Sequence, residues 1–199
     1  MNIAVFCSGN GTNFQAIADA ARNKYFDASV SIMICDNKDA RAMQRAKTEN
    51  IKTLLVERDN FRTREDFENK IMAQLEKNNI ELICLAGFMK IFSSDFIKKY
   101  KNMIINVHPS LLPAFKGAHG IKDAFEYGVK ITGVTVHFVT EAVDSGPVIL
   151  QQPLEIESSD TLESLEEKIH AIEHKLYPEA IRLYAEGRLE VNDKKVNIK

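Results

Sequence analysis

The chain has 199 residues, which is enough for one globular domain with a full hydrophobic core. A hydrophobic content of 45%, a charged content of 27% and a net charge of -2 are typical of an ordinary globular protein and argue against a nucleic-acid-binding surface. No apolar run reaches membrane-spanning length and no basic leader precedes the first apolar segment, so we expect a cytoplasmic protein with no membrane partner. Cys7, Cys35 and Cys84 lack metal-binding spacing, and we expect them to be reduced and buried.

Apolar segments of strand length alternate with helical patterns through the first hundred residues. We expect strands at about 2–7, 30–35, 53–56, 82–86 and 103–107, and helices at about 14–21, 40–49, 64–77 and 94–100. Continuous apolar strands joined by helices are typical of a parallel sheet with helices on both faces. The predicted fold is therefore α/β, a single-domain Rossmann-like open twisted sheet.

The second half of the chain predicts an antiparallel addition to this sheet. A short helix at about 121–127 leads to a strand at 131–140, a turn at 141–147 and an antiparallel partner strand at 148–156. A long helix then runs from about 160 to 185, and Tyr177-Pro178 predicts a kink or break in it. We expect the polar tail 192–199 to be frayed.

A glycine-containing loop follows the first predicted strand. Ser8-Gly9-Asn10-Gly11-Thr12-Asn13 lies between a strand and a helix, a layout that points backbone amides at an anion. The dinucleotide fingerprint would need a third glycine where this chain has Phe14, so a phosphate monoester is favoured over a pyrophosphate. Asp36, at the end of the second strand, keeps a dinucleotide open, and a plain tight turn is the alternative to any ligand.

Asn106 and His108 end the last strand of the parallel series. Their side chains share one face of the strand, about 7 Å apart along it, and Pro109 stops the strand. An amide donor beside an imidazole can stabilise an oxyanion and move a proton. Asp144, in a later turn, would favour the imidazolium if it approached His108. The alternatives are a polar strand end turned by proline and a turn-capping aspartate.

Five segments, spread over nearly the whole chain, resemble a known family. They are Ser8-Gly9-Asn10-Gly11-Thr12-Asn13, Leu85-Ala86-Gly87-Phe88-Met89, Asn106-Val107-His108-Pro109-Ser110-Leu111-Leu112-Pro113, Gly133-Val134-Thr135-Val136-His137-Phe138-Val139 and Asp144-Ser145-Gly146-Pro147-Val148-Ile149. On these segments the chain resembles the glycinamide ribonucleotide formyltransferases. The resemblance implies the formyltransferase fold and transfer of the formyl group of 10-formyltetrahydrofolate to the amine of N1-(5-phospho-D-ribosyl)glycinamide (glycinamide ribonucleotide), in purine biosynthesis and without a covalent formyl-enzyme.

The resemblance also implies roles for individual residues. In catalysis, Asn106 and His108 would stabilise the developing oxyanion, and His108, supported by Asp144, would move protons. For the ribonucleotide it implies phosphate binding by Gly11, Thr12 and Asn13, and contact of Glu173 with the ribose or glycinamide. For the folate it implies Arg64, Met89, Lys90, Ile91, Phe92, Asn106, Thr140, Glu141, Val143 and Asp144, with Leu85 and Ile97 as further wall residues.

The same resemblance implies 10-formyltetrahydrofolate as co-substrate, no metal, and a monomer or weak homodimer. Residues 1–100 would form the half that binds the ribonucleotide phosphate, and residues 101–199 the catalytic and folate-binding half. Lys90 stands where many relatives have arginine, which keeps the charge and removes a bidentate contact. The histidines His119 and His137 receive no catalytic role.

Rival functions remain open at this point. His170-Ala171-Ile172-Glu173-His174 spells the H-x-x-E-H motif of a zinc metallopeptidase, and two histidines four residues apart share a helix face. Formyltetrahydrofolate hydrolase and methionyl-tRNA formyltransferase share the Asn-x-His and Ser-Leu-Leu-Pro features, but each would be expected to carry a further domain. A non-catalytic phosphate-binding module would explain the glycine loop and leave Asn106, His108 and Asp144 without a task.

Overall fold

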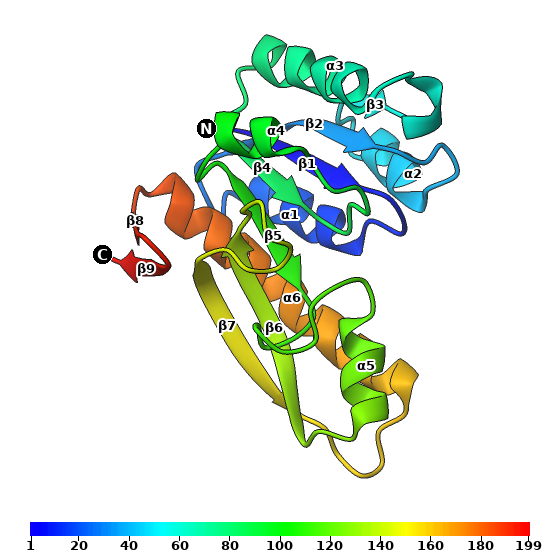
Figure 1. Cartoon of the computed structure of the whole chain (residues 1–199), viewed down its shortest axis with the longest axis vertical. Helices are drawn as coiled ribbons and strands as arrows, with labels where there is room; N and C mark the ends of the chain where they lie inside the picture. The colour runs from blue at the N-terminus through cyan, green and yellow to red at the C-terminus, as the bar shows by residue number, and fades with distance from the viewer.

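One nine-stranded sheet runs through the protein in a computed structural model that describes residues 1–199 (Figure 1). The strands are β1 (Asn2–Cys7), β2 (Ser29–Cys35), β3 (Thr53–Leu55), β4 (Leu82–Leu85), β5 (Ile104–His108), β6 (Ile131–Phe138), β7 (Val148–Glu155), β8 (Leu189–Asn192) and β9 (Lys195–Ile198). Their order is β3-β2-β1-β4-β5-β6-β7-β9-β8. The first five strands in this order, β3-β2-β1-β4-β5, pair in parallel with their neighbours. Strand β6 is antiparallel to both β5 and β7. The predicted mostly parallel sheet with an antiparallel late strand is confirmed.

Helices cover both faces of the sheet, as predicted. They are α1 (Thr12–Arg22), α2 (Arg41–Thr48), α3 (Arg64–Lys77), α4 (Ser94–Lys99), α5 (Gly120–Tyr127) and α6 (Leu162–Ala185), with a single 3-10 turn η1 (Arg58–Asn60). Alternate residues of the central strands point to two hydrophobic clusters, one shared with α1, α2 and α6 and the other with α3 and α4. The cysteines are free and buried in the first of these clusters, as predicted. None of the helices combines the length and apolar composition needed to span a bilayer.

The strand order reverses beside β1, and this reversal creates the crevice of the molecule. From β1 the chain adds β2 and β3 on one side, then returns to add β4 and β5 on the other. The loops that follow β1 and β4 meet there, because the Ser8 amide donates to the Gly87 carbonyl at 3.0 Å and the Met89 amide donates to Ser8 Oγ at 2.9 Å. Ligands of open α/β sheets bind at such a switch point, outside the carboxyl ends of the strands.

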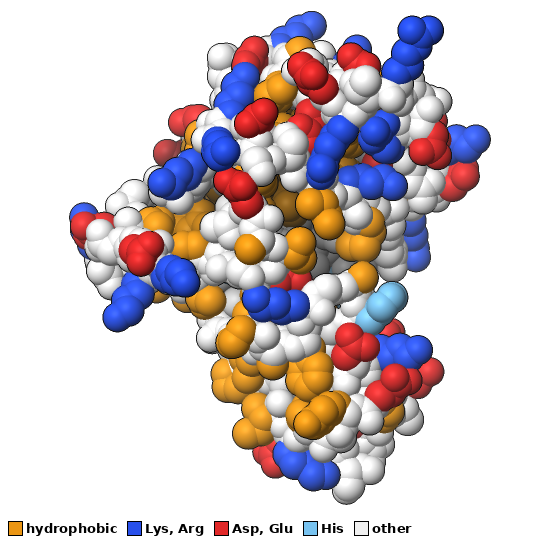
Figure 2. Space-filling view, viewed as in Figure 1, with side chains coloured by type: hydrophobic (Ala, Val, Ile, Leu, Met, Phe, Trp, Pro, Cys, Tyr) orange, Lys and Arg blue, Asp and Glu red, His pale blue; other side chains and the backbone are white.

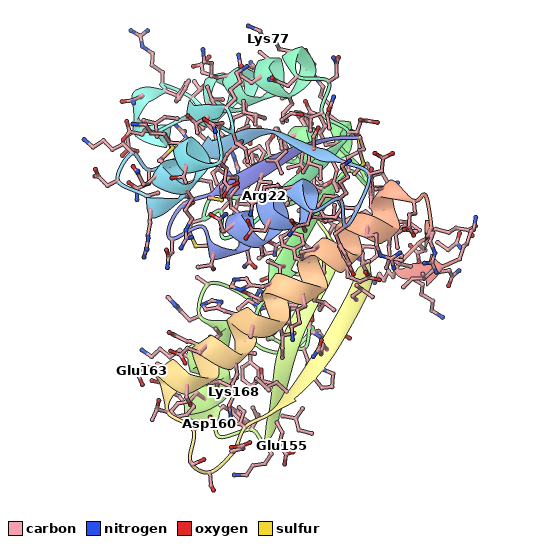
Figure 3. All side chains as sticks on the ribbon, turned by 180° about the vertical axis from the view of Figure 1, so that it is seen from behind. Arg22, Lys77, Glu155, Asp160, Glu163 and Lys168 are labelled. Carbon is pink, nitrogen blue, oxygen red and sulfur yellow. The ribbon has the colours of Figure 1, made fainter.

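Of the predicted kink or break at Tyr177-Pro178, the break does not occur, because the long helix α6 continues through Pro178. Figure 3 shows α6 crossing the back of the molecule, with Asp160 and Lys168 near its N-terminal end. It begins where Thr161 and Ser164 form a capping box. Proline removes only one backbone donor, and Tyr177 beside it is fully buried and donates its hydroxyl to carbonyls of β4 and β5. Packing along the whole helix outweighs that loss.

The C-terminal tail is also ordered, contrary to the prediction of fraying. Strands β8 and β9 form an antiparallel hairpin, and β9 adds to the sheet beside β7. Its turn contains Asp193 in the left-handed region, at φ 55°. Leu189, Val191 and Val196 pack against the larger hydrophobic cluster. With so few apolar residues, the pattern is too short to be recognised in the sequence.

Candidate functional site

Two adjoining cavities open at the carboxyl edge of the sheet. The apolar cavity, of about 130 Å³, is lined by Leu85, Ile91, Phe92, Ile97, Val139 and Val143 among others. The polar cavity, of about 390 Å³, is lined by Asn13, Met89, His108, Gly117, His170 and Glu173 among others. The two cavities share six lining residues, which are Phe88, Lys90, Ile91, Asn106, Val143 and Asp144. Two ligands bound side by side would therefore meet at Asn106 and Asp144.

The surface around this region is apolar. Figure 2 shows hydrophobic side chains gathered across the middle of the face, while charged side chains dominate its upper end. Met89, Ile91 and Val143 are 62%, 65% and 49% exposed. Exposed apolar side chains at the mouth of a cavity are typical of a ligand-binding site, because burial against a ligand removes them from water.

His108 lies at the end of β5, with its side chain on the same side as that of Asn106, as the strand alternation predicts. The flanking Ile105 and Val107 belong to the opposite hydrophobic cluster. The His108 side chain is buried, with Nε2 at 2.8 Å from the Phe115 carbonyl and Nδ1 at 3.5 Å from Asp144 Oδ2. Each ring nitrogen of His108 therefore faces an oxygen that can accept a hydrogen bond. No sequence pattern pointed to the Phe115 contact.

His137 holds the side-chain amide of Asn106. The two residues are paired across β5 and β6, and His137 Nε2 lies 3.3 Å from Asn106 Nδ2. His137 Nδ1 lies 2.9 Å from the Phe138 carbonyl, which can only accept, so a neutral ring presents Nε2 as an acceptor to Asn106. Burial lowers the pKa of His137 and favours that neutral form. One N–H of the Asn106 amide is thereby held, and the other remains for a ligand.

Asp144 reaches His108 because the loop after β6 folds back over the sheet. Asp144 has φ 47°, in the left-handed region, and its Oδ2 accepts a hydrogen bond of 2.8 Å from the Gly117 amide. Gly146 makes the fold-back possible, since a Cβ there would lie 1.8 Å from the Phe138 carbonyl oxygen. The structure thus brings together Asn106, His108 and Asp144.

The glycine loop approaches the site from β1. Gly11 precedes α1 with φ 73°, and a Cβ there would lie 2.7 Å from the Ala42 side chain, so only glycine fits. No side chain caps the N-terminus of α1, which leaves its first amides free to bind an anion.

Glu173 brings α6 to the same loop. Its buried carboxylate accepts hydrogen bonds from Asn13 Nδ2 at 2.8 Å and from His170 Nδ1 at 2.9 Å. The bond from His170 raises the pKa of that histidine, because it favours the charged ring. Glu173 therefore joins the polar cavity to the N-terminus of α1, and His170, which the sequence suggested only as a ligand of the metallopeptidase alternative, also lines that cavity.

The folate candidates fall into three groups. Lys90, Ile91, Phe92, Asn106, Thr140, Glu141, Val143 and Asp144 line the apolar cavity. Met89 lines only the polar cavity. Arg64 lines neither, because its guanidinium donates to the Ile91 carbonyl and lies near Glu68. Phe88, which lines both cavities, was missed, although it lies inside the Leu85–Met89 segment.

The metallopeptidase alternative is not supported. The rings of His170 and His174 are stacked with centroids 6.3 Å apart, and Glu173 is engaged by Asn13 and His170. No three side chains among His, Cys, Asp and Glu are arranged to hold a metal ion. The H-x-x-E-H spelling therefore arises from helix positions that serve the polar cavity and the packing of α6.

Comparison with known proteins gives a consistent result. Residues 1–181 match the formyl transferase family. The chain is 43% identical to phosphoribosylglycinamide formyltransferase of Bacillus subtilis (strain 168) over 179 residues, covering 90% of this chain and 92% of that protein. It is 38% identical to the trifunctional purine biosynthetic protein adenosine-3 of Homo sapiens, covering 96% of this chain and 19% of that protein. The crystal structure of glycinamide ribonucleotide transformylase 1 from Symbiobacterium toebii superposes with a TM-score of 0.96 at 41% identity, over 100% of this chain and 93% of that one.

Proposed function

The chain belongs to the formyl transferase family, and from that premise we propose that it transfers the formyl group of 10-formyltetrahydrofolate to the amine of glycinamide ribonucleotide in purine biosynthesis. The observation that carries the proposal is the meeting of two chemically different cavities at Asn106 and Asp144. A direct transfer between two substrates requires that their reacting atoms meet at one point with the catalytic groups around it.

Each cavity suits one substrate. The apolar cavity has aliphatic and aromatic walls that suit the flat pterin of the folate, and polar side chains such as Asn106, Thr140 and Asp144 that suit its hydrogen-bonding groups. The polar cavity is adjoined by the uncapped N-terminus of α1, which suits the ribonucleotide phosphate. Residues Gly11, Thr12 and Asn13 would bind this phosphate, and Glu173 would contact the ribose or glycinamide.

The chemistry follows from the groups at the junction. The substrate amine attacks the formyl carbon, a C–N bond forms, and the formyl oxygen gains negative charge. The free N–H of Asn106 would donate to that oxygen, as a preorganised donor does, and a protonated His108 would add positive charge beside it. The bond from carbon to N10 of the folate then breaks, so N10 gains a proton and the former amine loses one. His108, held by Asp144, is the group placed to move these protons.

The remaining assignments complete the proposal. We place the pterin against the eight candidates that line the apolar cavity, with Met89 at the boundary between the substrates. Arg64 would act at the edge of the folate site, near the glutamate tail. Residues 1–100 supply the ribonucleotide phosphate site and, through residues 85–97, one wall of the folate site, and residues 101–199 supply catalysis and the rest of the folate site. We further propose that the enzyme needs no metal and acts in the cytoplasm as a monomer or weak homodimer.

The test is the release of tetrahydrofolate from 10-formyltetrahydrofolate by purified, chelator-treated protein, with and without glycinamide ribonucleotide. We expect release that depends on the ribonucleotide, with formylated product and no added metal. Release without the ribonucleotide would replace the transferase with formyltetrahydrofolate hydrolase. Absence of release in both cases would overturn the proposal.

A further inference from the structure

A buried carboxylate outside both cavities is bound to a segment, residues 88–93, that lines both of them. Glu68 lies on α3, and its side chain is 5% exposed. It accepts a hydrogen bond of 2.6 Å from the Ser93 amide and a second one from the Ser93 hydroxyl. Arg64 Nε lies 3.3 Å away and supplies the compensating charge. A buried carboxylate with three donors is a satisfied and rigid group.

Arg64 extends this contact to a second point. Its Nη2 donates to the Ile91 carbonyl, so the Glu68–Arg64 pair holds the segment 88–93 at both Ile91 and Ser93. Residues 88–93 have no regular secondary structure, and they supply Phe88, Lys90 and Ile91 to both cavities. Figure 1 shows α3 and α4 beside each other above this part of the sheet.

The segment has further anchors, since Lys90 Nζ lies 3.7 Å from Asp36 Oδ2 and the rings of Phe88 and Phe92 pack against Phe6. At its start the Met89 amide donates to Ser8 Oγ, and on its inner side Phe92 stacks between Phe88 and Phe96. Its end leads into α4, which has only six residues and takes Ser93 as its N-cap. So short a helix does not hold its own position, which makes external contacts decisive.

We propose that Glu68 is a positioning residue for the folate site, which sets the shape of the apolar cavity by holding residues 88–93 through Ser93 and Arg64. The proposal rests on the proposed function. Glu68 does not line the apolar or the polar cavity, so it acts through the segment alone. The guanidinium of Arg64 therefore has two proposed roles: it holds the segment 88–93, and it acts at the edge of the folate site.

The experiment compares Glu68→Ala and Glu68→Gln with Glu65→Gln, a matched control on an exposed position of the same helix. Steady-state kinetics with both substrates and hydrogen–deuterium exchange of the peptide covering 86–96 are measured for each. We expect Glu68→Ala to raise the KM for 10-formyltetrahydrofolate roughly tenfold, with little change in kcat or in the KM for the ribonucleotide, as loss of a supporting contact implies. Exchange in 86–96 should become faster.

Glu68→Gln keeps an acceptor for the Ser93 amide and loses the charge that pairs with Arg64, so its effects should be intermediate, and Glu65→Gln should match the wild type. A folded Glu68→Ala enzyme with wild-type folate KM and exchange would overturn the proposal, as would equal losses for both substrates. If Glu68→Ala does not fold, Glu68→Gln and Ser93→Ala provide the same comparison. Absence of wild-type turnover would refute the proposed function, whereas the exchange measurement would still test the positioning role.

Discussion

Replacing His137 by leucine removes the acceptor that holds the Asn106 side chain. His137 is 2% exposed, and its Nε2 lies 3.3 Å from Asn106 Nδ2 while Nδ1 is bonded to the Phe138 carbonyl. The amide of Asn106 makes no other side-chain contact of this kind, so it becomes free to rotate in the variant. The second N–H would then no longer be aimed at the position of the oxyanion.

The size of the effect follows from these contacts. A positioned oxyanion donor raises kcat by a factor of roughly 10²–10³. A mobile Asn106 would still provide part of this acceleration, so we expect kcat to fall about tenfold. The Phe138 carbonyl also loses its imidazole donor inside the protein, which costs about 1–3 kcal/mol of unfolding free energy. For a chain of this size, Tm falls by roughly 2–4 °C for each kcal/mol.

Burial of His137 also sets a pH dependence of stability. The unfolded ring binds a proton near its ordinary pKa of 6.5, and the folded ring has a lower pKa. Below about pH 6.5 the unfolded state therefore binds more protons, and wild-type stability falls as the pH falls through the folded pKa. The leucine variant lacks this dependence.

The assay is steady-state kinetics with both substrates, together with thermal unfolding between pH 5 and 8. His119→Leu is the matched control, because His119 is exposed and makes no capping hydrogen bond at the start of α5. Unchanged kcat in a folded His137→Leu enzyme would refute the view that His137 positions Asn106.

Four further substitutions test other parts of the structure. His108→Ala should lower kcat at least about a hundredfold without unfolding the protein, the usual scale for a positioned acid or base. Tyr177→Phe should cost about 1–3 kcal/mol of unfolding free energy, because its fully buried hydroxyl bridges two strand carbonyls, and urea unfolding measures this. Gly146→Ala should lower kcat roughly a hundredfold, because a Cβ 1.8 Å from a carbonyl oxygen forces the loop of Asp144 to move. His170→Gln should lower the free energy of unfolding mainly at acidic pH. Because the folded pKa of His170 is raised, its stabilising contribution is complete below about pH 6.5 and disappears as the pH rises through the folded pKa. Unfolding curves measured across this pH range will show the difference.

Each of these has a control or a contradicting outcome. Tyr25→Phe is the control for Tyr177→Phe, since its hydroxyl bond to Glu179 is exposed. Ser145→Ala, next to Gly146 and on the surface, adds no volume and should retain activity. A folded His108→Ala enzyme with near-normal turnover would remove His108 from the mechanism. Stability of His170→Gln that differs from the wild type equally at every pH would contradict the ion pair with Glu173.

Much of the architecture is readable from local patterns. Continuous apolar segments at strand length, separated by helical periodicity, predicted the parallel series and both helix layers, because each element must bury its apolar side against another. The same reasoning placed the Ser8–Asn13 loop, the Gly87 loop and His108 at one edge of the sheet, since parallel strands end together. Alternation along β5 correctly put Asn106 and His108 on one side. These conclusions need only the direction of each strand and the period of its side chains.

Tertiary contacts decided the rest. The close approach of Gly146 to Phe138 lies within the loop of Asp144, but the contacts of Asp144 with Gly117 and His108 join it to distant segments that no local pattern specifies. Likewise the continuity of α6 through Pro178 and the C-terminal hairpin β8–β9 depend on packing against distant strands, which outweighs weak local propensity. The sequence by itself determined which edge of the sheet carries the candidate site. Only the tertiary structure determined which side chains meet there, because those contacts join residues far apart in the chain and their energies depend on burial that no local segment can provide.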